Sequence, residues 1–232
     1  MACEAEPAVK SNQGGVGAYT ERFENDNTGS TAPQAPLPKT RQFKRLKTMG
    51  KKALLLIDVQ NDFCTGGNLA VPNGEEIVPV INKLMSEGGY DLIAASLDWH
   101  PQDHGSFVSQ HPGKKVFETG ELSGQPQIIW PDHCVQGTKG AEFHPDLDKE
   151  KIDHIQTKGT DKTVDSYSAF RDNMQDRLTG LSDYLQEQGI TELHICGLAT
   201  DVCVNFSLLD SAELLPGVKL VFVDDASRGF AE

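Results

Sequence analysis

The stretch Ala53-Leu54-Leu55-Leu56-Ile57 decides the fold. Five consecutive apolar residues suit a strand that is buried on both faces, as in a parallel sheet. Outward from this stretch, apolar runs predict further strands at 92–97, 154–158, 193–196 and 218–223. Helical spacing predicts three helices, marked by Ile77, Val80, Ile81, Leu84 and Met85, by Leu178, Leu181 and Leu185, and by Val202, Phe206 and Leu209. Strands that alternate with helices predict an α/β fold, a three-layer α/β/α sandwich with a mostly parallel central sheet.

The chain of 232 residues divides near residue 52. Residues 1–52 are expected to form a disordered N-terminal tail, because 1–38 hold few apolar residues and cannot bury enough surface to fold. Residues 39–52 contain seven Lys and Arg and no acid, and we interpret them as a basic linker, with a localisation or docking signal as the alternative. Residues 53–232 are expected to form one domain.

Charge and cysteine content exclude several classes of partner. Residues 53–232 carry twelve Lys and Arg against twenty-nine Asp and Glu, a formal charge of −17, which argues against nucleic acid. No apolar run approaches the roughly 20 residues of a membrane span. Five cysteines without metal-knuckle spacing indicate a reduced protein inside the cell. We expect a cytoplasmic protein, with the nucleus as an alternative.

Side chains that could act in catalysis follow the predicted strands. Asp58, Asp98, Lys158 and the segment 197–203 all come at carboxyl ends, where parallel sheets bind ligands. A thiol, a carboxylate and an amine together suggest a hydrolase that attacks an amide through a thiolate. Cys203 is expected near a helix N-terminus and beside Lys158, two features that lower a thiol pKa. Asp58 is then the group that accepts the thiol proton.

A second group of residues suggests a metal site. In Asp98-Trp99-His100, the carboxylate and the imidazole are two residues apart and point to the same side of a strand end. His133 would complete a set of one carboxylate and two imidazoles with open positions for other ligands, as in catalytic zinc sites. His104 is either a fourth ligand or a residue that supports the ligands. Thr200 and Asp201 are expected to cap the helix that follows them.

Five segments, taken together, resemble one family. They are LLLIDVQNDF (54–63), LDWHPQDHGSF (97–107), WPDHCVQGTKGAEFHP (130–145), TKG (157–159) and GLATDVCV (197–204). Over about 53–230 the chain resembles the nicotinamidase branch of the isochorismatase-like cysteine hydrolases. The resemblance implies that family's fold for residues 53–232.

The resemblance also implies roles for individual residues. The family's catalytic triad matches Asp58, Lys158 and Cys203. Its oxyanion hole matches the backbone amides of Ala199 and Cys203, after a cis peptide bond between Leu198 and Ala199. One divalent metal ion, often zinc but also iron or manganese, would bind Asp98, His100 and His133 and orient the pyridine nitrogen of the substrate. Phe63 and Trp130 would form walls for a flat aromatic ring.

The implied reaction is the hydrolysis of nicotinamide to nicotinate and ammonia in NAD salvage. Pyrazinamide-like amides should also be accepted, and members of the family often form homo-oligomers. One alternative is another isochorismatase-like hydrolase, such as an isochorismatase or a carbamoyl-amide hydrolase. A second is an inactive truncated scaffold for protein interaction. This second alternative is expected if the domain is shorter at its C-terminus than in the family, because a shortened domain would lose stability and activity.

Overall fold

The structure is a computed structural model that describes residues 50–231. The predictions of a disordered tail over 1–38 and of a basic linker over 39–49 fall outside the described residues. Lys51 and Lys52 do not belong to a linker, because they form the first two residues of strand β1. None of the helices in the described range is long and apolar enough to cross a membrane.

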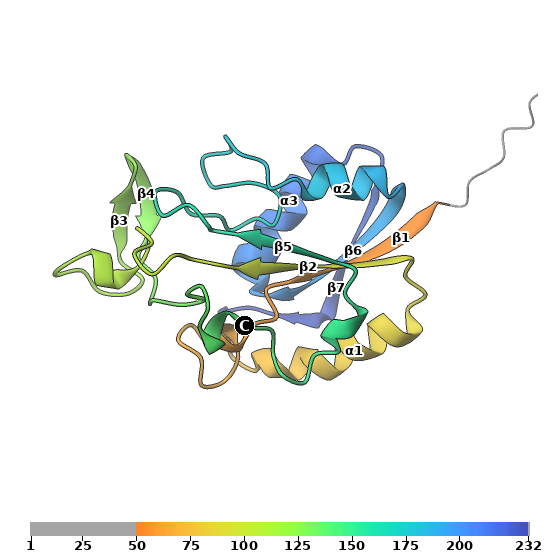
Figure 1. The fold of residues 1–232 in the computed structure, drawn as a ribbon, viewed down its shortest axis with the longest axis horizontal. Helices are drawn as coiled ribbons and strands as arrows, with labels where there is room; N and C mark the ends of the chain where they lie inside the picture. The colour runs from red at the N-terminus through yellow and green to blue at the C-terminus, as the bar shows by residue number, and fades with distance from the viewer. Residues whose placement is uncertain (1–49, 232) are drawn as a thin grey trace, which may run out of the picture. The chain divides into compact units, whose positions relative to one another are not determined.

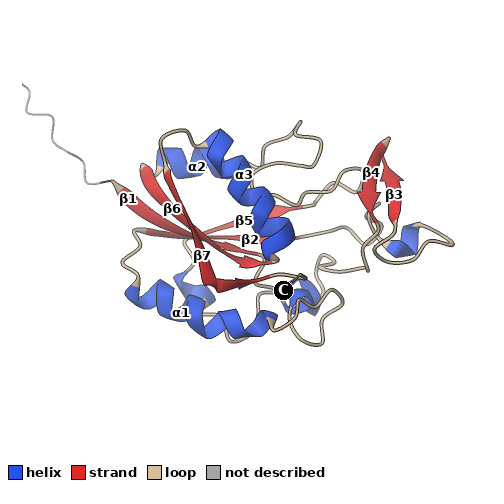
Figure 2. Cartoon of the chain, turned by 180° about the vertical axis from the view of Figure 1, so that it is seen from behind, coloured by secondary structure: helices blue, strands red, loops and turns tan. Residues whose placement is uncertain are grey.

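Seven strands and three α-helices follow one another within residues 50–231. They are β1 (Lys51–Ile57), α1 (Ile77–Glu87), β2 (Leu92–Asp98), β3 (Thr119–Leu122), β4 (Gln125–Ile128), β5 (His154–Lys158), α2 (Leu181–Glu187), β6 (Ile190–Leu198), α3 (Asn205–Leu214) and β7 (Lys219–Arg228). Five strands form a parallel sheet in the order β5-β2-β1-β6-β7. Helix α1 covers one face, and α2 and α3 cover the other (Figures 1 and 2). The predicted three-layer fold is confirmed.

The predicted central strand is the centre of the core. All five residues from Ala53 to Ile57 have no solvent exposure, and β1 pairs with β2 on one side and with β6 on the other. Alternate side chains of β1 enter different layers: Leu54 and Leu56 pack with α1, and Leu55 and Ile57 pack with α2. Burial on both faces explains why this strand shows no polar alternation in the sequence.

The register of the sheet places the candidate site. Asp98 and Lys158 are direct register partners in β2 and β5, and Ile57, just before Asp58, pairs with Gly197 of β6. The strand order reverses around β1, which is where ligands bind in open parallel sheets. The long irregular stretch between β2 and β5 contains the β3–β4 hairpin, which lies beyond the carboxyl ends of the strands (Figure 1).

Two helix predictions need correction. Leu178 is 53% exposed and lies outside α2, which starts at Leu181 after Gly180 adopts a φ of +96°. In α3, Phe206 and Leu209 face solvent. The face of α3 that packs inward carries Ser207, Asp210 and Ser211 instead. The cause is a π-helical turn, Thr200–Val204, just before α3. Its i→i+5 hydrogen bonds add a residue to the turn, so the side chains of α3 point in other directions than a regular 3.6-residue spacing from Val202 predicts.

Candidate active site

The predicted catalytic residues meet at the carboxyl edge of the sheet. Asp58 follows β1, Lys158 ends β5, and Cys203 lies in the π-helical turn Thr200–Val204 between β6 and α3. The Lys158 Nζ atom lies 3.0 Å from Asp58 Oδ2 and 3.5 Å from Cys203 Sγ. All three side chains are buried. The structure therefore brings together the carboxylate, the amine and the thiol.

Lys158 is surrounded by acceptors. Besides contacting Asp58 and Cys203, its Nζ donates to Asp98 Oδ1 at 2.8 Å and to the Ser166 carbonyl oxygen at 3.0 Å. Burial acts to lower the pKa of Lys158, but the charges of Asp58 and Asp98 outweigh it and hold this pKa well above its ordinary value. The side chain is therefore a permanent ammonium that links two carboxylates.

Asp58 is arranged to accept a proton. Its Oδ1 accepts a hydrogen bond from Ser96 Oγ at 2.7 Å, whereas its Oδ2 has no hydrogen-bond partner of suitable direction among residues 50–231. Complete burial raises the pKa of Asp58, Lys158 opposes this shift, and the charge of Asp98 adds to it. A carboxylate with a raised pKa, whose Oδ2 lies 3.0 Å from the Lys158 ammonium but receives no directed hydrogen bond, is a suitable base for the Cys203 thiol.

The pKa of Cys203 shifts in the direction opposite to the prediction. Burial raises it well above the ordinary value, Lys158 lowers it by less, and Asp58 and Asp98 raise it further. The prediction of a lowered pKa is wrong. It includes the effects of the Lys158 ammonium and of the helix N-terminus, but it omits the loss of water around the sulfur atom, which raises the pKa. The resting nucleophile is therefore a thiol, and it becomes reactive by giving its proton to Asp58.

The turn before Cys203 carries the groups implied for the oxyanion hole. The peptide bond between Leu198 and Ala199 is cis, as the resemblance implies. Ala199 and Cys203 both line one small cavity. Both residues therefore lie where the carboxamide of a bound substrate would meet the nucleophile, and the role of their amides as oxyanion donors stays a prediction.

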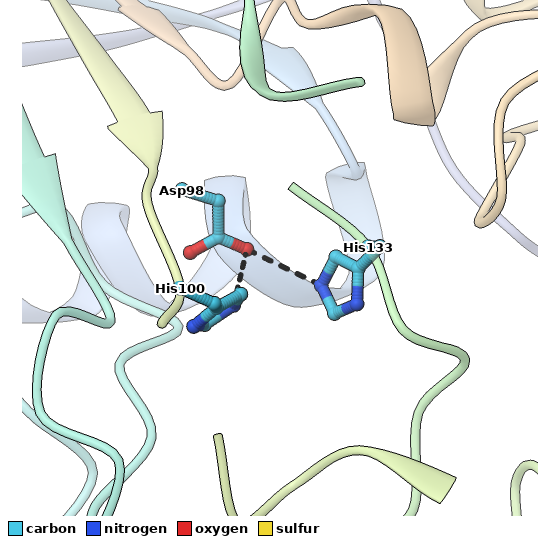
Figure 3. A group of neighbouring side chains, drawn as sticks. All are labelled: Asp98, His100 and His133. Carbon is cyan, nitrogen blue, oxygen red and sulfur yellow. Dashed lines mark ion pairs between the residues drawn. The ribbon is translucent and has the colours of Figure 1, made fainter. Parts of the chain in front are cut away.

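The predicted metal ligands converge beside the triad (Figure 3). His100 Nε2 lies 3.2 Å and His133 Nε2 lies 3.4 Å from the same atom, Asp98 Oδ2. All three residues are buried, and their candidate donor atoms lie within 4.8 Å of one another. One carboxylate and two imidazoles suit zinc and other divalent transition metals.

The hydrogen bonds of the two imidazoles fit a bound cation. His100 Nδ1 donates to the Gly159 carbonyl oxygen at 2.8 Å, and His133 Nδ1 donates to the Pro131 carbonyl oxygen at 2.7 Å. With both Nδ1 atoms protonated, the two Nε2 atoms face Asp98 Oδ2, and a positive charge among these three atoms, either a metal ion or a proton on His100, is what holds them together. A Cβ at position 159 would lie 2.3 Å from His100 Cε1, so glycine at φ +64° permits this packing.

His104 lies beside a ligand rather than opposite Asp98. The His100 and His104 ring centroids are 4.2 Å apart, and His104 forms a second donor group with His100 and Asp165. The Nδ1 of His104 bonds to Ser106 Oγ at 2.8 Å, and its Nε2 has no hydrogen-bond partner within the described range. Both roles expected from the sequence, a fourth ligand and a residue that supports the ligands, stay predictions.

Aromatic side chains enclose a cavity next to Cys203. Phe63 and Trp130 line it, as expected, together with Tyr167. Trp130 Nε1 donates to Tyr167 Oη at 3.2 Å and holds the two rings edge to face. The open space between the walls is about 20 Å³, comparable to the volume that holds one water molecule. The mostly apolar lining, with the metal-binding group on one side, suits a small aromatic ring that carries a polar atom.

Sequence patterns miss two residues of the site. Ser96 lies two residues before Asp98 on β2, so strand alternation places both side chains on one face, and this spacing could have identified it. Tyr167 lies in an irregular segment where no spacing marks it. Gln60 exchanges two hydrogen bonds of 2.8 Å with the backbone of Asp98 and so fixes the end of β2.

The other described cysteines are separate from this chemistry. Cys64, Cys134 and Cys196 are buried and free, and Cys196 lies inside β6 as expected for a core residue. Burial raises the pKa of each thiol, to about 11 for Cys64. Among the residues that line the cavity, Cys203 supplies the thiol.

The buried group of Asp58, Lys158 and Cys203 at the carboxyl edge of a parallel sheet is the arrangement expected of a hydrolase with a cysteine nucleophile. The family model of the isochorismatase domain matches residues 52–232. The chain belongs to the isochorismatase family.

Within this family, the chain is similar to proteins named nicotinamidase or pyrazinamidase. The chain is 48% identical over 183 residues to the nicotinamidase of Escherichia coli, an alignment that covers 78% of this chain and 84% of the relative. The solved nicotinamidase and pyrazinamidase of Acinetobacter baumanii superposes with a TM-score of 0.74 at 44% identity, covering 79% of this chain and 86% of the other. The pyrazinamidase of Pyrococcus horikoshii, solved in complex with zinc, superposes with a TM-score of 0.61 at 34% identity, covering 78% and 87%.

Proposed function

We propose that this protein is a nicotinamidase, which hydrolyses nicotinamide to nicotinate and ammonia in NAD salvage. One observation carries the proposal: Lys158 contacts both Cys203 and Asp58 beside a cavity whose aromatic walls and metal-binding group fit a pyridine carboxamide. The similarity to the nicotinamidase of Escherichia coli supports it. Pyrazinamide-like amides fit the same description and are proposed as further substrates.

The first half of the reaction forms a thioester. Asp58 Oδ2 accepts the Sγ–H proton of Cys203, and the sulfur attacks the carboxamide carbon while the carbonyl π electrons move to oxygen. The negative charge moves from Asp58 to sulfur, and Lys158 lies within 3.5 Å of both atoms, so it stabilises either distribution. The amides of Ala199 and Cys203 are the proposed donors to the oxyanion. Collapse of the intermediate breaks the C–N bond as Asp58 gives its proton to the leaving ammonia.

The second half releases the acid. Asp58, again ionised, accepts a proton from water, and the oxygen of that water attacks the thioester carbon. The C–S bond breaks, Cys203 regains its proton from Asp58, and nicotinic acid leaves and loses its remaining proton to solvent as nicotinate. The same carboxylate therefore handles all proton transfers, which its raised pKa supports.

We also propose that Asp98, His100 and His133 hold one divalent ion, with zinc favoured and iron or manganese as alternatives. The donor set and the two imidazole tautomers support this assignment. When bound, the ion supplies a Lewis acid that orients a ring nitrogen of the substrate.

The cellular setting is proposed from the cysteines. The four cysteines within residues 50–231 are free and buried, which supports a reducing compartment, the cytoplasm or the nucleus. A homo-oligomer in solution is likewise proposed from the family resemblance, and gel filtration with light scattering tests it. Separate fractions of cells that express a tagged chain would test the compartment.

The proposed function is tested by ammonia release from nicotinamide. Purified protein is assayed as prepared, after chelation, and after zinc is restored, with Cys203→Ala in parallel. We expect turnover that chelation removes, that zinc restores and that Cys203→Ala lacks. A folded, zinc-loaded protein without turnover would falsify the nicotinamidase proposal and favour a scaffold role. Turnover that resists chelation would overturn the metal assignment alone.

A further inference from the structure

The segment after β7 folds back onto the turn that carries the nucleophile. The Phe230 N–H donates to Asp201 Oδ1 and the Ala231 N–H donates to Asp201 Oδ2, each at 3.1 Å. Asp201 lies two residues before Cys203 in the same π-helical turn. The expectation that Asp201 caps the following helix is wrong, because its carboxylate binds these two amides and α3 has no side-chain cap.

The fit between this segment and the turn is close. A Cβ on Gly229 would lie 3.0 Å from Asp201 Oδ1 and 3.3 Å from the Thr200 Cβ, which is tighter than ordinary contact. Glycine therefore allows the chain to approach near enough for the Asp201 carboxylate to reach two successive amides. The position of Phe230 is in this way tied to the turn that positions Cys203.

The Phe230 ring forms part of the wall of the cavity. Phe230 and Trp130 both line it, their centroids are 6.4 Å apart, and their planes differ by 26°. A flat ring between two others requires about 7 Å, since stacked carbon atoms approach to about 3.5 Å. The observed separation is slightly too small for a third ring, in agreement with the small cavity volume. A modest outward shift of one wall would admit a substrate.

Phe230 is the wall with the weaker attachment. Trp130 is 9% exposed and held by its backbone bonds to Ser106 and Val108 and by its side-chain bond to Tyr167. Phe230 is half-buried, and its backbone is held to Asp201 at the protein surface. A shift of Phe230 therefore disturbs fewer contacts than a shift of Trp130.

We propose that Phe230 is a fourth aromatic wall of the substrate site, after Phe63, Trp130 and Tyr167, and the wall that moves to admit substrate, with Asp201 as its positioning residue. In the bound state the pyridine ring lies between Trp130 and Phe230. This inference rests on the proposed nicotinamidase function and deepens it, because it assigns ring recognition to a residue outside the triad and the metal ligands. Phe230 contributes to binding of the ring and not to proton transfer.

The test measures binding without turnover. In a Cys203→Ala background, the dissociation constant of nicotinamide is measured by calorimetry with and without Phe230→Ala. We expect Phe230→Ala to weaken binding about 10-fold, given the worth of a stacked aromatic contact plus its buried area. Phe117→Ala is the matched control, since that ring meets Trp130 edge to face at 6.0 Å but does not line the cavity. It should leave the constant unchanged.

Kinetic variants test the positioning role. In the active protein, Phe230→Ala should raise KM about 10-fold and change kcat less than about 3-fold, and Phe230→Tyr should restore KM. Asp201→Asn keeps the shape but loses one acceptor, so it should raise KM in the same direction by a smaller factor. Thermal unfolding of each variant confirms that it is folded.

The outcomes separate the two proposals. If the Cys203→Ala protein binds nicotinamide and Phe230→Ala does not change the constant, the inference is wrong and the nicotinamidase proposal stands. Equal effects of Phe117→Ala and Phe230→Ala would also overturn the inference, because they would indicate a general loosening around Trp130. A metal-loaded Cys203→Ala protein that does not bind nicotinamide overturns both.

Discussion

Asp58 and Asp98 are the same residue type at the ends of neighbouring strands, yet their surroundings give them opposite acidities. Both are buried, and Lys158 contacts both. For Asp58, burial raises the pKa, and the contacts from Lys158 and Ser96 do not cancel this effect. For Asp98, burial also acts to raise the pKa, but His100 and Lys158 outweigh it and hold the pKa well below its usual range.

This contrast assigns the two roles. A carboxylate that takes a proton readily serves as the base for a thiol, whereas one that stays ionised serves a cation. Two halves of the site surround these carboxylates. The base side contains Asp58 and Cys203, and the metal side contains Asp98, His100 and His133. Both halves contact the Lys158 ammonium, so variants that disturb one half, both halves or a single hydrogen bond test whether the two carboxylates have separate roles.

The largest expected effect is confined to the base side. Cys203→Ser should lower kcat/KM at least about 10⁴-fold, as when other hydrolases lose their nucleophile, because the buried hydroxyl is a far weaker acid than the thiol. The content of bound metal should stay the same, since the metal side is intact. Ammonia assays and metal analysis of the same sample check this. Loss of metal from Cys203→Ser would contradict the separation of the two halves.

Disturbing the shared ammonium should affect both halves at once. Lys158→Met leaves Asp58 and Asp98 buried without their cation, so the free energy of unfolding should fall by about 3–5 kcal/mol. Chemical denaturation measures it. Lys162→Met is the matched control, because Lys162 forms an ion pair with Asp103 in which both side chains are more than half exposed. A similar loss in both variants would mean that the burial of the Lys158 cluster does not determine its effect.

On the metal side, His133→Ala should weaken zinc binding at least about 100-fold. Even the loss of a residue that supports a metal ligand costs roughly 10–100-fold, and His133 is itself a proposed ligand. Competition with a chromophoric chelator measures the affinity. His144→Ala, a histidine outside the donor groups, is the control and should bind zinc as before. Unchanged affinity in His133→Ala would remove this residue from the metal site.

The smallest expected effect comes from Ser96→Ala, which tests the pKa difference between Asp58 and Asp98. The Ser96 hydroxyl lowers the Asp58 pKa, so Ser96→Ala should raise it. Activity requires ionised Asp58, and the acid limb of kcat/KM against pH should therefore move to higher pH. At the optimum, loss of one hydrogen bond of about 1 kcal/mol should lower kcat/KM roughly 5-fold. An acid limb that stays in place, or that moves to lower pH, would show that Asp58 is not the group that titrates.

Much of the fold and the site was predictable because both depend on patterns that are local in sequence. The apolar run 53–57 and its counterparts identify the parallel strands, and the residues after them identify one edge of the sheet. Asp58, Asp98 and Lys158 are brought together by the register of that sheet. The cis bond at Leu198–Ala199 agrees with the resemblance.

The failures have identifiable physical causes. The π-helical turn before α3 changes the residues per turn, so the apolar spacing of Val202, Phe206 and Leu209 predicts the wrong buried face. The Cys203 pKa depends on how much water the fold removes, which no local motif reports. The Asp201 contact joins residues 29 and 30 positions apart, and sequence spacing gives no indication of such a pairing.

The raised pKa of Cys203 also protects the enzyme from oxidants. Peroxides convert thiolates to sulfenic acids far faster than they convert thiols. Without a substrate, burial favours the protonated form of the sulfur, and Cys203 is only 6% exposed to solvent. We therefore expect Cys203 to react with peroxide more slowly than an exposed thiolate does.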